Sequence, residues 1–327
     1  MPNFTRRTLL AMAAISSISA MPLPGHAQAY PSHPVRLVVG YAPGTAPDVL
    51  ARFFAQRLGE QLKQQVIVDN KPGAGGQIAA QTVAKSAPDG YTLLLGEVGS
   101  IAIAPPAFSK LPYDPAKELA GISEVARVDF LLVVPADAPY QTLADFVKAM
   151  RARPGKVNFG TFGAGTSGHF GAELFGEAAG FKVEPVHYRA TGDAVTAIIG
   201  GDVSAVFAST ALGAAQVKGG KMRALATTAP QRSPLLPQVP TFAESGYPKI
   251  DISAWFALMA PKATPAAILD LLSREAVSAV QSPETKGKIV DAGFSVFGTT
   301  RSETDAMLRA EATRWTAIVK ASGFRGD

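Results

Sequence analysis

Short apolar runs alternate with amphipathic segments along this chain, and this alternation constrains the fold more than any other feature. Val35–Val39 is followed by a Gly/Pro turn and a segment of helical periodicity at 47–62. Val66–Asp69, a second helical segment ending near Ala84, and Tyr91–Leu95 continue the pattern. Strands that alternate with helices form mainly parallel sheets covered by helices on both faces. The pattern therefore predicts an α/β fold.

A second set of strands and helices follows a proline-rich connection between Pro105 and Pro115. We predict its strands at Phe130–Val134, Val157–Thr161, Val183–Tyr188, Val203–Ala208 and Met222–Thr227, and a further apolar run at Ile250–Ala260. Helices are expected at 142–150, 168–179, 265–281, 284–292 and 302–321. The sequence thus predicts two lobes, one comprising residues 30–130 and 253–327 and the other residues 131–252. In such a fold a ligand lies beyond the carboxyl ends of the strands, at the switch point or between the lobes.

The first 29 residues have the pattern of an export signal. Arg6 and Arg7 precede an apolar stretch from Leu9 to Ala20, and Ala27-Gln28-Ala29 matches a signal-peptidase site. We expect cleavage after Ala29 and a periplasmic product. The paired arginines also approach a twin-arginine signal, so the export route stays open. A membrane anchor is the weaker alternative because the apolar stretch is too short to span.

Composition excludes several classes of protein. The chain has no cysteine, which removes disulfides, thiol nucleophiles, iron–sulfur clusters and Cys-type zinc sites. Its net charge is only +5, and no Lys/Arg cluster with interleaved aromatic residues indicates nucleic-acid binding. No later segment contains an apolar run long enough to span a membrane, so we expect a soluble product.

The sharpest motif is Gly163-Ala164-Gly165-Thr166-Ser167-Gly168, which follows a predicted strand and opens a predicted helix. With Glu184 about 20 residues further on, it resembles a dinucleotide fingerprint. The free N–H groups of a helix N-terminus bind a carboxylate equally well, and Thr166 and Ser167 add hydroxyl donors. We favour carboxylate capture, with dinucleotide binding and a purely structural turn as alternatives.

A second loop, Tyr41 to Asp48, follows the first strand in the same way. Gly44 permits close backbone approach, and the amides of Thr45 and Ala46 can point at a ligand. Asp48 is a candidate partner for ligand or bound water, or simply a first-turn acid that favours the helix dipole. The glycine-rich segment Pro72–Gly76 lacks the Lys-Ser/Thr ending of a phosphate loop and is expected to be a turn.

Catalytic motifs are sparse. Neither H-E-x-x-H nor G-x-S-x-G occurs. Ser167 and His169 form the only pair that suggests a nucleophile and base, and a packing role for His169 is the better interpretation. Asp193 is expected in the first turn of a helix, and Tyr188 and Arg189 at a strand end, where ligand contacts cluster in this architecture.

Taken together, the segments of this chain resemble the Bug family of periplasmic solute-binding proteins, which serve tripartite tricarboxylate transporters. The resemblance spans the mature chain and is carried by Pro34–Val39, Asp48–Arg52, Asn70–Gly76, Ala87–Leu94, Leu111–Pro115, Lys221–Ala226, Val239–Gly246 and Trp255-Phe256.

The resemblance implies a two-lobed periplasmic binding fold that closes on a small carboxylate. One carboxylate would bind at Thr161 and Gly165–Ser167, and the far end of the ligand at Gly44–Asp48. Three departures from the family pattern, at Pro47, Ala104-Pro105 and Ala208-Ser209, reduce the polar groups of the cleft. A dicarboxylate or aromatic carboxylate is therefore expected rather than an amino acid.

The sequence thus predicts a periplasmic solute-binding protein without catalytic residues, cofactor or metal, monomeric and partnered by membrane permease subunits. A ligand-sensing receptor and an exported hydrolase are the alternatives. The candidate ligand-binding residues are Tyr41, Gly44, Thr45, Ala46, Asp48, Ser100, Thr161, Gly165, Thr166, Ser167, Tyr188, Asp193 and Ser209.

Overall fold

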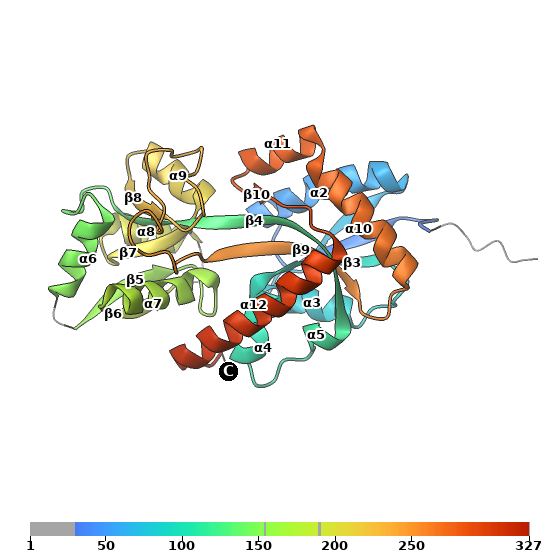
Figure 1. Ribbon diagram of the computed structural model, residues 1–327, viewed down its shortest axis with the longest axis horizontal. Helices are drawn as coiled ribbons and strands as arrows, with labels where there is room; N and C mark the ends of the chain where they lie inside the picture. The colour runs from blue at the N-terminus through green and yellow to red at the C-terminus, as the bar shows by residue number, and fades with distance from the viewer. Residues whose placement is uncertain (1–29, 154, 189–190, 327) are drawn as a thin grey trace, which may run out of the picture. The chain divides into compact units, whose positions relative to one another are not determined.

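The computed structural model describes residues 30–153, 155–188 and 191–326 (Figure 1). The predicted signal peptide, its cleavage site and Arg189 lie outside the described residues. From residue 33 onward the chain forms one compact unit, and this unit is described below.

The first set of strands forms a parallel sheet, as the sequence predicts. It contains β1 (Val35–Val39), β2 (Val66–Asn70) and β3 (Thr92–Glu97), in the order β2-β1-β3. Both pairs run parallel, with Leu37 of β1 opposite Val68 of β2 and Leu93 of β3. The connecting segments are α2 (Ala46–Leu62), the short turn η1 (Ala74–Gly76) and α3 (Gln77–Ala84).

A second parallel set follows later in the chain. It consists of β5 (Lys156–Thr161), β6 (Lys182–His187) and β7 (Ala205–Ser209), with β5 in the middle. The helices are α6 (Leu143–Arg151), α7 (Ser167–Ala179), α8 (Thr191–Gly200) and α9 (Thr210–Lys218), and β8 (Met222–Thr227) completes the set. Its core is aromatic: Phe146, Phe159, Phe175 and Phe207 are buried together.

Two long strands, β4 (Leu119–Pro135) and β9 (Ser253–Pro261), run antiparallel to their neighbours and connect the two sets (Figure 1). β4 pairs with β9 as far as Asp129, and with β7 and β8 from Phe130 and Leu131 onward. The sequence predicted only the second half of β4. The lobe limits at 130/131 and 252/253 stay a prediction.

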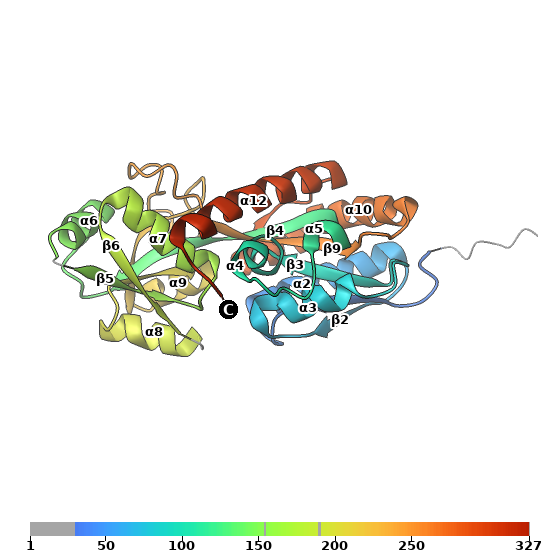
Figure 2. The ribbon, with the colours of Figure 1, turned by 90° about the horizontal axis from the view of Figure 1, so that it is seen from below.

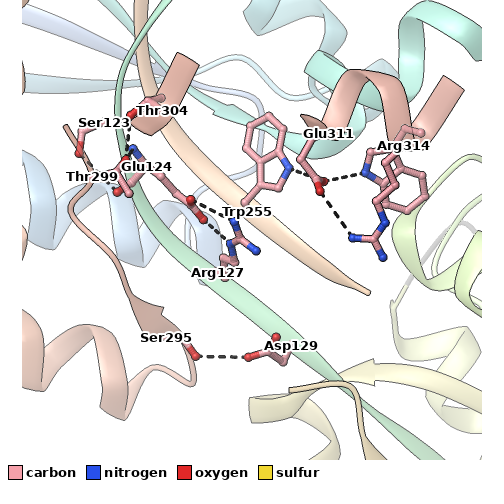
Figure 3. Close-up of polar contacts among 11 residues, drawn as sticks. Ser123, Glu124, Arg127, Asp129, Trp255, Ser295, Thr299, Thr304, Glu311 and Arg314 are labelled. Carbon is pink, nitrogen blue, oxygen red and sulfur yellow. Dashed lines mark hydrogen bonds and ion pairs between the residues drawn. The ribbon is translucent and has the colours of Figure 1, made fainter. Parts of the chain in front are cut away.

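Polar side chains in the first half of β4 find partners within the fold (Figure 3). Glu124 is 2% exposed and forms an ion pair with Arg127, while its backbone N–H donates to Thr299 Oγ1 at 2.8 Å. On the neighbouring strand, Trp255 donates its indole N–H to Glu311 Oε2 at 2.9 Å. Trp315 donates to the same oxygen at 2.9 Å.

The C-terminal elements are α10 (Ala266–Gln281), α11 (Pro283–Asp291), β10 (Ser295–Val296) and α12 (Arg301–Ser322). Three of the four contact β4, and the fourth, α11, packs against α2 and α10. Thr300 caps α12 through a reciprocal hydrogen-bond pair with Glu303. Figure 2 shows α12 reaching from the region of α10 to α7, where Trp315 packs against Phe170 with ring centroids 5.8 Å apart.

Between β3 and β4 lie three short elements: η2 (Gly99–Ile103), α4 (Ala104–Ala107) and α5 (Pro115–Glu118). Among the described residues, none of the helices has the length and apolarity needed to cross a membrane.

Candidate ligand-binding site

The register of the strands brings the carboxyl ends of the two parallel sets to face each other. Glu97, the last residue of β3, lies opposite Phe256 of β9, which lies opposite Ala126 of β4. Ser209, the last residue of β7, lies opposite Phe130 of β4. The four-residue step from Ala126 to Phe130 corresponds to about 13 Å of extended strand. The loops after β1 and β3 therefore face those after β5, β6 and β7 across a short gap.

The N-terminus of α7 presents one buried hydroxyl without a partner. Thr166 is the N-cap: its Oγ1 accepts from the backbone N–H of His169 at 3.3 Å and donates to the Gly163 carbonyl at 2.9 Å. Ser167 is the first helical residue and only 4% exposed, and its Oγ has no hydrogen-bond partner among the described residues. A buried polar atom normally has a partner, so the Ser167 hydroxyl is an exception at this helix end.

Neighbouring side chains hold this loop in place. The backbone N–H of Gly165 donates to Nδ1 of His169 at 3.1 Å, and Phe324 packs against the ring of His169 with centroids 5.2 Å apart. Thr161, at the end of β5, shares a 2.7 Å hydrogen bond with Nδ1 of His187. The hydroxyls of Thr161 and Thr166 are thus already bonded within the protein.

The loop after β1 is organised by Asp48, which is 2% exposed. Its Oδ1 accepts from Asn70 Nδ2 at 2.8 Å. Its Oδ2 accepts from the Gly44 N–H at 2.8 Å and from Arg52 Nε at 2.9 Å. Burial alone would raise the pKa of Asp48, but these hydrogen bonds and the Arg52 charge outweigh it and lower the pKa. Both carboxylate oxygens are occupied, so the observed role of Asp48 is to order the loop.

The other candidates of this loop differ in exposure. Gly44, Thr45 and Ala46 are exposed; the hydroxyl of Thr45 donates to the Ala42 carbonyl at 2.7 Å, and Ala46 begins α2. Tyr41 is half-buried, and its carbonyl accepts from Asn70 at 2.9 Å.

The four remaining candidates also lie at strand ends or helix starts. Ser100 is buried, and its Oγ donates to the Glu97 carbonyl at 3.1 Å. Ser209 caps α9 by accepting from the Leu212 N–H at 3.4 Å. Tyr188 is half-buried after β6, and Asp193 is exposed in the first turn of α8.

Sequence reasoning missed one residue, Glu97, which is 9% exposed at the end of β3. Its Oε2 accepts from the Gly99 N–H at 2.7 Å, and it is hydrogen-bonded to the side chain of Tyr41. Burial raises the pKa of Glu97 to about 7, although both hydrogen bonds act to lower it. The available signal was a single acid ending an otherwise apolar strand, at the sheet edge where ligands bind.

The alternative chemistries find little support in these contacts. The ring nitrogens of His169 face the Gly165 N–H and, at 3.4 Å, Glu173 Oε1, so no hydrogen bond joins His169 to Ser167. Glu184, the acid of the dinucleotide alternative, forms an ion pair with Lys156 on the sheet. Within the described part of the chain, no cluster of three or more His, Asp or Glu side chains is arranged to hold a metal.

Comparison with solved structures identifies the class of protein. The R. palustris protein Rpa4515, solved with adipate, matches with a TM-score of 0.81 and 31% identity, covering 90% of this chain and 99% of that one. MatC of Rhodopseudomonas palustris, solved with malate, matches with a TM-score of 0.76 and 28% identity, covering 89% of this chain and 100% of that one. The fold is that of the periplasmic binding proteins.

The family follows from the sequence itself. The model of the tripartite tricarboxylate transporter family receptors matches residues 50–324. Protein BugT of Bordetella pertussis is 35% identical over 325 residues, which cover 99% of each chain. The chain therefore belongs to the tripartite tricarboxylate transporter family of receptors. Members of this family are periplasmic solute-binding proteins rather than enzymes, as the sequence predicted.

Proposed function

We propose that this protein captures a small organic carboxylate between its two sets of strands, at the N-terminus of α7. The observation that carries the proposal is the buried, unpartnered Oγ of Ser167, at a helix end whose N–H groups and dipole favour an anion. The similarity to proteins solved with adipate and malate supports the same ligand class.

The rest of the ligand would meet the opposite loops. Tyr41, Gly44, Thr45 and Ala46 would contact it, and Asp48, which accepts hydrogen bonds from Gly44 and Asn70, would hold their loop in place. We infer that residues 30–130 with 253–327, and residues 131–252, behave as two lobes that close on the ligand. Contacts made by both lobes only in the closed state would drive that closure.

Partner and location follow the family. The liganded protein would deliver its solute to the permease subunits of a tripartite transporter, as a monomer. We further propose export by the N-terminal signal with cleavage after Ala29, by the Sec or twin-arginine route. A dicarboxylate or aromatic carboxylate is the proposed ligand class.

Ser167→Ala tests the proposal. Because its hydroxyl has no partner in the described part of the chain, we expect the variant to keep its unfolding free energy within about 0.5 kcal/mol and to lose about 10-fold in carboxylate affinity. Ser86→Ala is the matched control, since the Ser86 hydroxyl bonds to the Val83 carbonyl at the end of α3, away from the site. Unchanged affinity in Ser167→Ala, measured by calorimetric titration with dicarboxylates, would contradict the proposed site.

A further inference from the structure

The second inference rests on the proposed function and concerns the end of the ligand that lies away from α7. We propose that Glu97 determines specificity at that end: it accepts a hydrogen bond from a ligand hydroxyl or ammonium group, and it admits a second carboxylate only by taking up a proton. Glu97 then refines the proposed ligand class: a dicarboxylate is favoured where Glu97 is protonated, and a carboxylate with a hydroxyl or ammonium group at its far end is favoured where Glu97 is ionised.

The placement of Glu97 supports this role. It ends β3 at the sheet edge that faces the α7 loop, and its Oε2 lies 2.6 Å from where a Cβ on Gly99 would stand, so the backbone passes close to it. The Gly99 N–H and the Tyr41 side chain use part of its hydrogen-bonding capacity. A carboxylate has about four acceptor sites, so further donors can be accommodated.

The charges around Glu97 explain why it is selective. Tyr41 and Tyr113 are the titratable side chains that interact with it, and both are neutral near pH 7, with the pKa of each raised further by burial and by Glu97. None of the ion pairs within the described residues involves Glu97. A second anion beside an unpaired, buried carboxylate is repelled strongly, whereas protonated Glu97 can donate a hydrogen bond to it.

The α7 end has the opposite preference. It offers N–H and hydroxyl donors, which suit a carboxylate. The α7 side and the Glu97 side of the site therefore select different groups at the two ends of a ligand. Because burial raises the pKa of Glu97 to about 7, both of its protonation states are accessible near neutral pH.

The test uses matched probes that differ only at one end. Succinate, glutarate and adipate are each compared with the acids of the same length in which an amino or a hydroxyl group replaces one carboxylate. Affinities are measured by calorimetric titration between about pH 5.5 and about pH 8.5, in two buffers of different ionisation enthalpy to count protons. For the wild type we expect the hydroxy or amino acid to bind best above pH 7. Above pH 7 we also expect the affinity for dicarboxylates to fall about 10-fold per pH unit, because their binding requires the uptake of a proton.

Glu97→Gln should remove both effects: dicarboxylate affinity becomes independent of pH, and the preference for a donor end falls about 10-fold. Glu284→Gln, a change of an exposed acid on α11, is the matched control and should behave as wild type. If the wild type binds dicarboxylates with no pH dependence or proton uptake, the inference about Glu97 is overturned while carboxylate capture stands, whether or not the variant folds. If no probe binds, carboxylate capture itself fails and the inference fails with it.

Discussion

The backbone N–H of Gly165 donates a hydrogen bond to Nδ1 of His169, 3.1 Å away, and so ties the proposed carboxylate loop to the first turn of α7. His169 is 2% exposed and its ring lies against Phe170 and Phe324. The histidine that suggested a catalytic base in the sequence is thus observed as a support for the loop.

Replacing His169 with alanine should weaken both the fold and ligand binding. The lost packing and hydrogen bond should cost about 2–4 kcal/mol of unfolding free energy, measured by urea denaturation. Because the Gly165 loop is released, carboxylate affinity should also fall about 10-fold. His33→Ala, an exposed histidine before β1, is the control and should leave affinity unchanged. A His169→Ala protein with wild-type affinity would contradict the positioning role.

Asp48→Asn should destabilise the protein in a pH-dependent way. The pKa of Asp48 is lowered from 3.8, so its ionised form stabilises the fold. That contribution is complete above the unfolded pKa and is lost as the pH falls through the folded pKa. We expect a deficit of about 1–3 kcal/mol at pH 7 that shrinks below about pH 4.

Denaturant titrations across this pH range measure the Asp48 deficit. The exposed Asp193 provides the control, since Asp193→Asn should change the unfolding free energy by less than about 0.5 kcal/mol. A deficit for Asp48→Asn that grows on acidification would have the wrong sign and would exclude the ionised carboxylate as the stabilising form.

Glu311 accepts hydrogen bonds from the indole N–H groups of two buried tryptophans. Its variants should distinguish the contribution of these hydrogen bonds to stability from that of the negative charge. Glu311→Ala leaves the N–H groups of Trp255 and Trp315 buried without an acceptor, for an expected cost of about 2–4 kcal/mol. Glu311→Gln keeps an acceptor oxygen and should lose less than half as much. Equal losses in thermal unfolding would mean that the two hydrogen bonds contribute little.

The pH dependence of stability in the ligand-free protein should also reveal the protonation of Glu97. The pKa of Glu97 is raised from 4.5 to about 7, so the protonated form stabilises the folded protein. The contribution of Glu97 to the unfolding free energy is therefore complete below pH 4.5 and is lost as the pH rises through 7. The total is at most about 3 kcal/mol. Glu97→Gln lacks this dependence, so its unfolding free energy relative to wild type should rise between about pH 5 and about pH 8. A constant difference across that range would contradict the raised pKa.

Most of the fold was predictable because the strands of the parallel sets are short, mainly apolar segments that alternate with helical segments. The predicted bounds of β1 and β8 coincide with the observed ones. The first half of β4 was missed because Glu124 and Arg127 interrupt the apolar pattern. Glu124 and Arg127 form an ion pair with each other, and the Glu124 N–H donates to Thr299 Oγ1. Thr299 lies far along the chain, so a local pattern cannot reveal this contact.

The site was predictable where local rules apply. The Thr166 cap and the start of α7 follow from helix-end chemistry, and Ser167 was identified on that basis. Sequence did not reveal that both Asp48 oxygens accept hydrogen bonds from within the protein, nor that Glu97 is buried beside Tyr41. Both facts depend on tertiary neighbours, Asn70 in one case and Tyr41 in the other.

Thermal unfolding with paired ligands tests carboxylate capture most directly. Succinate, glutarate, adipate, malate and aromatic acids are each compared with the uncharged amide of the same shape, using protein purified without refolding. A ligand at 100 times its dissociation constant adds about 2.7 kcal/mol of stability, an easily measured shift. We predict that at least one acid stabilises the protein and that its amide does not. Stabilisation by amides and acids alike, or by none of them, would contradict carboxylate capture at α7.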